Sequence, residues 1–220
     1  MNIKPEPDSH ISVCICTYKR PSMLSNLLSK LQNQVTNNQF TYSVVVVDND
    51  ANQSAKDTVN DWQNKSAIQI DYHCQTEQNI ALTRNRAVEN AKGNFIAFID
   101  DDEFPKDMWL LDLFKTYHAY QCDGVLGPVK PYFDGTPPVW LVRGKFCDRE
   151  SHNTGMVLDW KQTRTGNVLI DAGIFKKENV RFDPSFGRTG GEDQYFFKTA
   201  INSGKSFVWC NEAEVFETVP

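Results

Sequence analysis

The feature that most constrains the fold is an alternation of apolar runs and amphipathic segments over the first 100 residues. Residues 11–17 and 42–48 are short, β-branched runs, which are typical of strands buried on both faces. Segments with apolar residues at helical spacing follow them. This alternation predicts β-α-β units and an open, mainly parallel sheet flanked by helices. The expected strands are 11–17, 42–48, 68–74 and 94–100, with helices beginning at 21 and covering 54–64 and 79–93.

The second half of the chain is less regular. Residues 133–165 are rich in glycine, proline and polar residues. A loop of that length inside a domain is usually functional or disordered. The other segments predict helices at 105–121 and 190–205, strands at 123–132, 206–210 and 213–217, and a return to ordered structure at 166–173.

The most apolar of the expected strands runs directly into four acids. Residues 95–99 lead into the sequence Asp-Asp-Asp-Glu at 100–103. If the chain stays extended, Asp100 and Asp102 point to the same side. A hard cation such as Mg²⁺ or Mn²⁺ would compensate their charge and turn a bound diphosphate into a good leaving group. The alternative is a solvated acidic turn before a helix that begins at Pro105.

Polar residues also follow other expected strands, whose carboxyl ends form the ligand-binding edge of such sheets. Asp48 follows four valines and can accept a hydrogen bond from a base N–H, or it is a turn residue at the strand end. Arg84 and Arg86 belong to the helix that leads into the acidic strand. Their guanidinium groups suit phosphate or a base carbonyl, or they form a solvated helix face.

A further acidic pair stands at the start of the last expected helix. Glu192 and Asp193 follow two glycines, which would let another group approach closely. A carboxylate in this position could act as general base on an incoming hydroxyl. The alternative is ordinary negative charge at a helix N-terminus.

Five sequences together resemble the inverting family 2 glycosyltransferases, which have the GT-A fold. They are VCICTYKRP, VVVVDND, NIALTRNRAVENAKGNFIAFIDDDE, TGNVLI and GGEDQYFF, in the family's order. The third is the most specific, because it joins the arginine helix to a DxD-type strand end. The resemblance implies an open, mainly parallel Rossmann-like sheet in one domain, with a nucleotide-sugar-binding half (1–104) and an acceptor-binding and catalytic half (105–220).

The resemblance also implies roles for individual residues. Asp193 would be the catalytic base, supported by Glu192, and Asp102 would bind Mn²⁺ or Mg²⁺. Residues implied at the nucleotide are Thr17, Tyr18, Asp48, Arg84, Asp100 and Asp101. Residues assigned to the sugar or acceptor are Asn167, from the resemblance, and Trp140 and Trp160, as stacking platforms or alternatively as core or lid packing.

The chain departs from the family pattern at its last strand. Many members carry a histidine there, near the metal, whereas this chain reads VFETVP. Either Glu217 or water would take the place of the histidine, or the loop that this site needs is absent. The ending directly after a strand also suggests that the natural protein continues beyond Pro220.

The expected activity is transfer of a sugar from a nucleotide diphosphate sugar, with UDP as the expected nucleotide, to an acceptor hydroxyl, with inversion and metal assistance. The acceptor would be a glycan or lipid-linked. One alternative is a nucleotide-sugar-binding module without turnover. Another is a nucleotidyltransferase, which is disfavoured because TYKRP has no glycine for a phosphate-binding loop.

Composition limits the partners and the compartment. The net charge of −5 argues against a nucleic-acid binder. No apolar run is long enough to cross a bilayer, and the first ten residues lack a signal-peptide core. The six cysteines form no CxxC pair and fit free thiols in a reducing compartment. We therefore expect a cytoplasmic enzyme, with peripheral attachment to the inner membrane face through residues beyond 220 if the acceptor is lipid-linked.

Overall fold

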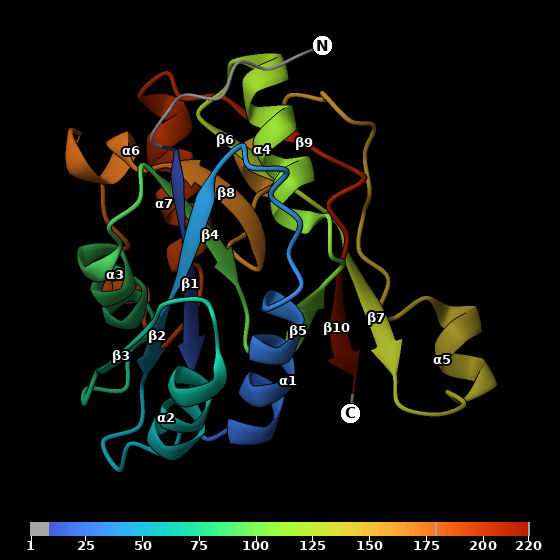
Figure 1. Cartoon of the computed structure of the whole chain (residues 1–220). Coiled ribbons are helices and arrows are strands. Elements are labelled where there is room, and N and C mark those ends of the chain that lie inside the picture. Colours follow the sequence, from blue (N-terminus) through green and yellow to red (C-terminus); the bar gives the residue numbers. More distant parts are fainter. Residues whose placement is uncertain (1–8, 179, 220) are drawn as a thin grey trace.

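A seven-stranded sheet runs through the middle of the molecule (Figure 1). The structure is a computed structural model and describes residues 9–178 and 180–219. The strand order is β3-β2-β1-β4-β8-β6-β9. Its strands are β1 (His10–Thr17), β2 (Thr41–Asp48), β3 (Ile70–Cys74), β4 (Phe95–Ile99), β6 (Gly124–Leu126), β8 (Asn167–Asp171) and β9 (Phe207–Trp209). All neighbours are parallel except β8, which is antiparallel to both β4 and β6.

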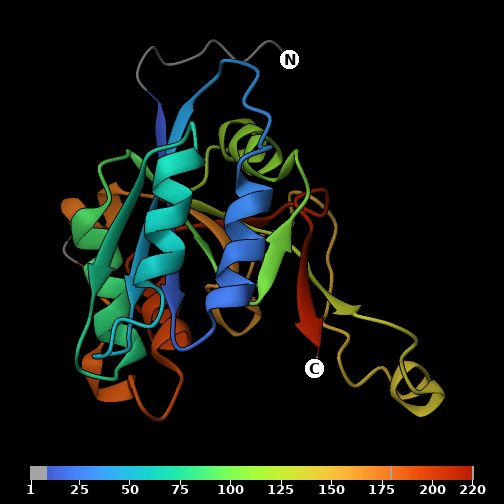
Figure 2. The same cartoon turned by 60° about the horizontal axis from the view of Figure 1, so that its bottom comes forward.

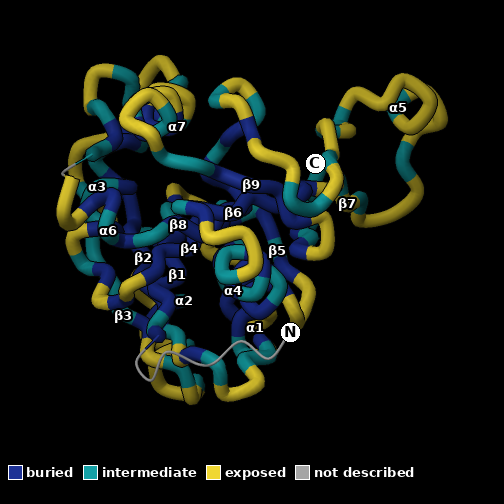
Figure 3. The backbone as a smooth tube through the Cα atoms, turned by 90° about the horizontal axis from the view of Figure 1, so that it is seen from above, coloured by how far each residue is buried: buried dark blue, intermediate teal, exposed yellow. Residues whose placement is uncertain are grey.

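Helices cover both faces of this sheet. They are α1 (Pro21–Leu31), α2 (Lys56–Lys65), α3 (Ile80–Asn90), α4 (Trp109–Tyr120), α6 (Gly173–Lys176) and α7 (Glu192–Asn202). One buried cluster joins the sheet to α1, α2 and α4, and a second joins it to α3, α6 and α7. Side chains alternate along each strand, so Val44 and Val46 enter the first cluster while Val45 and Val47 enter the second. The valine run is therefore buried on both faces, as its sequence predicts (Figure 3).

A second sheet of three strands adjoins the first. Its strands are β5 (Glu103–Pro105), β7 (Val129–Phe133) and β10 (Val215–Val219), in the order β5-β10-β7. Strand β10 is parallel to β7 and antiparallel to β5. The boundary between the two expected halves, after residue 104, thus falls inside β5, and the large sheet draws strands from both halves.

Three expected boundaries are wrong. Pro105 ends β5 instead of starting a helix, and α4 begins at Trp109. The single strand expected at 123–132 is two strands in two different sheets, separated by the Gly-Pro sequence at 127–128. Gly93 does not end α3, which stops at Asn90 and is followed by the extended residue Ala91.

The segment 133–165 is more ordered than its composition predicts. It contains helix α5 (Val139–Gly144) and a 3₁₀ turn, η1 (Trp160–Gln162). A second 3₁₀ turn, η2 (Pro184–Phe186), precedes α7. Figures 1 and 2 show α5 standing away from the rest of the molecule, beyond the end of β7.

The described residues also bear on the expected compartment. None of their helices combines the length and the apolarity that crossing a membrane requires. The six cysteines are all free thiols. The expectations about the first residues and about a continuation after Pro220 concern positions 1–8 and 220, which lie outside the described residues.

Candidate active site

A pocket of about 720 Å³ opens where β1, β2 and β4 end. It receives Thr17 and Tyr18 from the end of β1, Asn49 from the end of β2, and Asp100, Asp101 and Asp102 from the end of β4. Residues 78–80 and 187–188 line the α3 and α7 side, and Glu217 of β10 lines another wall. The ligand edge of the sheet predicted from the sequence is therefore a real pocket.

The acids after β4 form a turn, in which the N–H of Glu103 donates to the carbonyl of Asp100 at 3.1 Å. The extended geometry expected for them is therefore wrong, although all three aspartates still line the pocket. Asp101 is buried and accepts hydrogen bonds from the Thr17 hydroxyl at 2.7 Å and from Arg20 Nη1 at 3.0 Å. Burial raises the pKa of Asp101. This carboxylate thus holds the end of β1 against the end of β4.

Arg20 is the main compensating charge for the acidic turn. The same Nη1 atom donates to Asp102 Oδ2 at 2.7 Å, and half of the Arg20 side chain remains exposed. Asp100 faces a different arginine, with its Oδ1 atom 3.8 Å from Arg84 Nη2. Burial and the neighbouring Asp102 raise the pKa of Asp100, while Arg84 opposes them. The repulsion between the carboxylates is therefore relieved mainly by two arginines.

Glu103 has the least compensated carboxylate of the turn. It is buried, and its Oε2 atom accepts from the N–H of Asp100 at 3.2 Å, while no donor in the described part of the chain bonds to Oε1. Burial and the charge of Asp100 raise the pKa of Glu103 well above its usual range. Its ionised form thus lowers the stability of the fold.

Replacing Glu103 by glutamine tests this. A buried carboxyl with a raised pKa loses stability as the pH rises from about 4.5 through its folded value. Glu103→Gln keeps the acceptor but removes the charge, so we expect the variant to match the parent near pH 4.5 and to melt higher near pH 7, by a few degrees per kcal/mol. Melting curves from pH 4.5 to 8 measure the difference.

Glu214→Gln is the matched control for that series. Although burial acts the other way, hydrogen bonds from Lys106 and Lys130 lower the pKa of Glu214. Its substitution should therefore destabilise the protein near pH 7, the opposite sign. A Glu103→Gln variant that melts below its parent near pH 7 would refute the assignment.

Arg84 is buried and joins α3 to α7. Its Nη1 atom donates to Glu192 Oε1, and its guanidinium lies 5.7 Å from the ring centre of Phe182. Burial acts to lower the pKa of Arg84. The interactions with Asp100, Cys16 and Glu192 are together larger than this effect and raise the pKa. Arg84 does not line the pocket. In this structure Arg84 contacts Glu192 and Asp100, and it does not reach the pocket where its contact with base or diphosphate was expected.

Asp193 is the second residue of α7 and is partly exposed. Among the described residues, its Oδ1 atom accepts only from the backbone N–H of Gln194, at 2.7 Å. A Cβ atom at either of the preceding glycines would meet no described atom within 4 Å, so packing within the chain does not require them. They are required because Gly190 and Gly191 have φ values of +78° and +94°. An accessible carboxylate without a cationic partner at hydrogen-bond distance is suited to accept a proton.

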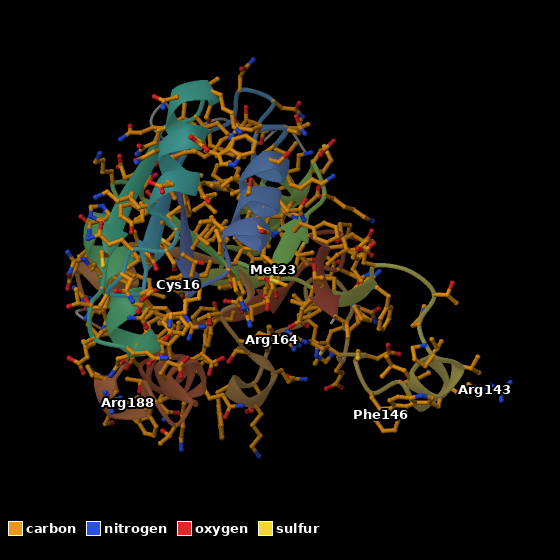
Figure 4. The ribbon with its side chains drawn as sticks, turned by 90° about the horizontal axis from the view of Figure 1, so that it is seen from below. Cys16, Met23, Arg143, Phe146, Arg164 and Arg188 are labelled. Atoms are coloured by element: carbon orange, nitrogen blue, oxygen red, sulfur yellow. The ribbon has the colours of Figure 1, made fainter. Side chains whose placement is uncertain are left out.

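Two further arginines come from the irregular segment 133–165. Arg149 Nη2 lies 2.5 Å from Glu217 Oε2. Burial and the charge of Arg149 lower the pKa of Arg164. The charges of Glu103, Glu217 and Asp193 act in the opposite direction but do not outweigh this effect. Among the described residues nothing forms a hydrogen bond or ion pair with the Arg164 guanidinium. A partly buried cation of this kind is suited to an anionic substrate group. Figure 4 shows Arg164 on the body of the molecule, together with Cys16 and Arg188.

Asp48 does not reach the pocket. It is fully buried, and its carboxylate accepts from the N–H groups of Asp50 at 3.0 Å and Ala55 at 2.8 Å and from the Tyr72 hydroxyl at 3.0 Å. These bonds engage both oxygens, as the strand-end alternative expects, and the structure does not bring Asp48 to the pocket for a hydrogen bond to a base. The adjacent Asn49 lines the pocket instead.

Asn167 is also a structural residue. It is fully buried, where Oδ1 accepts from Trp109 Nε1 at 2.8 Å and Nδ2 donates to the carbonyls of Pro128 and Ala213. These bonds connect β8 of the large sheet to the segments that precede β7 and β10 of the small sheet. The structure therefore does not bring Asn167 to the pocket, where a contact with a sugar was expected.

The two tryptophans expected as stacking platforms do not line the pocket. Trp140 is 66% exposed on α5, away from the sheet edge. Trp160 lies against α7, with Lys198 Nζ 5.0 Å from its ring centre. Trp140 is thus removed from the site, while Trp160 belongs to the packing around the helix that carries Asp193.

The donor set fits a metal ion that substrate would help to hold. Within the described residues no three His, Cys, Asp or Glu side chains are grouped to bind a metal by themselves. Mg²⁺ and Mn²⁺ are commonly held by one or two carboxylates together with phosphate oxygens and water. Asp100, Asp102 and Glu217 present carboxylates to one pocket, and the N–H of Thr218 bonds to the Asp102 carbonyl at 2.9 Å.

Comparison with protein families shows which family the chain belongs to. The family model for glycosyl transferase family 2 matches residues 12–183, most of the chain. The chain belongs to glycosyltransferase family 2. This family 2 protein is an enzyme that transfers sugars, so the nucleotidyltransferase alternative is wrong.

Several curated relatives resemble this family 2 glycosyltransferase. ExoM, a succinoglycan biosynthesis protein of Rhizobium meliloti, is 34% identical and covers 98% of this chain and 69% of its own length. The hyaluronan synthase of Pasteurella multocida is 29% identical over 94% of this chain and 24% of the synthase. The poly(ribitol-phosphate) beta-glucosyltransferase of Bacillus spizizenii is 27% identical over 89% of this chain and 30% of that enzyme. The chain thus spans less than a third of two of these relatives.

Solved structures show the same fold. S. aureus TarS in complex with UDP-GlcNAc matches with a TM-score of 0.71 at 19% identity, over 96% of this chain and 58% of TarS. TarS in complex with UDP matches with a TM-score of 0.70 over 95% of this chain and 60% of that chain. The likeness confirms the GT-A fold predicted for this family 2 glycosyltransferase.

The sequence interpretation missed several residues of the site. Arg20 and Arg188 line the pocket and stand beside recognised motifs, in TYKRP and in GRTGGED. Their positions next to those motifs are a signal that could have identified them. Arg164 directly precedes TGNVLI and carries the same signal. Arg149 carries no such signal, because only the fold brings it to Glu217.

Proposed function

We propose that this family 2 glycosyltransferase moves a sugar from a UDP-sugar to a hydroxyl of a glycan or lipid-linked acceptor, with inversion at the anomeric carbon. The observation that carries the proposal is the pocket in which Asp100, Asp101, Asp102 and Arg20 meet at the ends of β1 and β4. The UDP and UDP-GlcNAc named for the TarS structures support the donor class. The names of ExoM and hyaluronan synthase support a polysaccharide product.

The donor would occupy the pocket between the ends of β1 and β4. Thr17, Tyr18 and Asn49 line the part nearest β1 and β2 and would contact the nucleoside. Arg20 and Arg188 carry the positive charge of the lining and would contact the diphosphate. Guanidinium groups suit this because they donate paired hydrogen bonds to phosphate oxygens.

Mn²⁺ or Mg²⁺ would be held by Asp102, with Asp100 or Glu217, and when bound would neutralise charge on the diphosphate. Arg20 occupies one Asp102 oxygen in this structure, at 2.7 Å. Asp102 therefore has one oxygen available without displacing this arginine. Glu217 takes the place proposed for the family's histidine, although Arg149 must then share it.

Asp193 acts as the base. It takes the proton of the acceptor hydroxyl while the oxygen attacks the anomeric carbon from the face opposite the diphosphate. The bond from that carbon to the diphosphate oxygen breaks, and UDP leaves with the electron pair. Arg20, Arg188 and Arg164 stabilise the charge that develops on the leaving group, because preorganised cations need no reorientation during the step. The free thiols are consistent with a cytoplasmic site of action.

A ligand panel tests the donor class. UDP, UDP-glucose, UDP-N-acetylglucosamine and GDP-mannose are each added with Mn²⁺, Mg²⁺ or a chelator, and the melting temperature is measured. A ligand at a hundred times its Kd adds about 2.7 kcal/mol, or about 5–10 °C for a domain of this size. We expect that shift for UDP ligands with metal, a smaller one with chelator, and none for GDP-mannose. Equal shifts for both bases would contradict the UDP assignment.

A further inference from the structure

Helix α5 and the residues after it carry the most exposed apolar surface of the described chain. We define the α5 arm as residues 139–147. Five large apolar side chains among the described residues are more than half exposed, and four of them belong to this arm. They are Val139 (63%), Trp140 (66%), Val142 (55%) and Phe146 (73%). The rings of Trp140 and Phe146 lie 6.0 Å apart, so these side chains form one patch.

The arm does not belong to the core. Helix α5 has six residues and none of them is buried. It follows Pro137 and Pro138 and ends where Lys145 takes a left-handed conformation, with φ at 51°. A helix this short gains little from its own hydrogen bonds. Its apolar face is therefore exposed without packing against the rest of the described chain, which is unusual for a protein with no partner at that surface.

The charge of the arm differs from that of the chain. Arg143 and Lys145 are exposed between the apolar side chains, and no acid lies between residues 139 and 147. The arm thus carries +2 within a chain of net charge −5. Tryptophan and phenylalanine beside arginine and lysine are typical of segments that lie in a membrane interface.

The arm is also joined to the reaction site. It continues from β7, which pairs with β10, and β10 carries Glu217 of the pocket. Figure 4 shows Arg143 and Phe146 at the far end of the arm, beside the face on which Arg164 and Cys16 lie. A surface that bound the arm would therefore lie close to the side of the molecule where transfer takes place.

We propose that the α5 arm binds the surface of an anionic lipid bilayer. Trp140 and Phe146 enter the headgroup region, and Arg143 and Lys145 contact anionic headgroups. This goes beyond sugar transfer and differs from the expected attachment through residues beyond 220. A second copy of the chain fits less well, because a two-fold contact of the arms would bring Arg143 and Lys145 of both copies together.

Flotation with vesicles tests the proposal. The protein is mixed with vesicles of phosphatidylcholine alone or with 30% phosphatidylglycerol, without any nucleotide sugar. We expect it to float with the anionic vesicles and to be released by 0.5 M salt, which shortens the range of charge interactions. We expect Trp140→Ser/Phe146→Ser and Arg143→Gln/Lys145→Gln each to reduce binding at least tenfold.

Met156→Ser/Val157→Ser is the matched control, since Val157 is 65% exposed outside the arm. It should bind as the parent does, and unchanged melting curves of all variants show that each is folded. The proposal is overturned if the protein binds neither vesicle, binds both equally, or loses binding equally in the control. It is also overturned if the parent is a dimer in solution and the arm variants are monomers. None of these outcomes depends on the donor class.

Discussion

Asp193→Asn is expected to reduce the rate of sugar transfer by about three orders of magnitude, in the middle of the range for loss of a general base. Asparagine keeps the size of the side chain and an oxygen that accepts from the N–H of Gln194. It cannot accept the proton of the acceptor hydroxyl. Because Asp193 is outside the pocket lining, UDP binding should change little. Transfer is measured as UDP release with acceptor present, and UDP binding by the shift in melting temperature.

Asp57→Asn separates this effect from simple loss of charge at a helix start. Asp57 also lies in the first turn of a helix, α2, and is exposed. Its substitution removes the same favourable interaction with the helix dipole. The control should therefore transfer sugar at the parent's rate. If Asp193→Asn also keeps most of its turnover, Asp193 is not the base.

Arg84→Leu is expected to lower the free energy of unfolding by about 3–5 kcal/mol, because it leaves Glu192 buried without its partner. Asp100 also loses its nearest arginine. Glu192→Leu should cost less, since Arg84 keeps Asp100 at 3.8 Å. The double variant Arg84→Leu/Glu192→Leu should cost clearly less than the sum of the two, because no unpaired charge of the pair remains. Denaturant melts of the four proteins measure the coupling.

The exposed pair of Lys92 and Asp71 is the control for that cycle. Lys92 Nζ and Asp71 Oδ2 lie 3.1 Å apart, and 67% of the lysine side chain is exposed. Surface pairs contribute below about 1 kcal/mol, so Lys92→Met should have a small effect. If the Arg84 and Glu192 losses simply add, the pair does not act as a unit.

The link through Arg84 also explains how the two halves of the chain are kept in register. Glu192 precedes the proposed base directly, and Asp100 belongs to the acidic turn at the donor pocket. Arg84 touches both, from a helix of the first half. A change at this arginine should therefore move the base relative to the donor, although Arg84 itself does not line the pocket.

Some features could be read from the amino-acid sequence because they depend on neighbours along the chain. The valine run of β2 and the apolar run of β4 form buried strands, since their side chains alternate between two buried faces. The carboxyl ends of β1 and β4 meet at one edge of the sheet. Thr17 and Tyr18 therefore come to the same pocket as Asp100 to Asp102, as expected. The order of the strands was not readable, because pairing joins distant segments.

Only the tertiary structure decided which polar groups are free to act. Asp48 and Asn167 stand in motifs of the right type, yet hydrogen bonds from distant residues satisfy their side chains. Arg149 and Arg164 stand in no motif, yet the fold carries them to the acids of the site. A residue's type and local spacing determine the strand or helix it favours, whereas its availability depends on burial and on partners that lie far away in the chain.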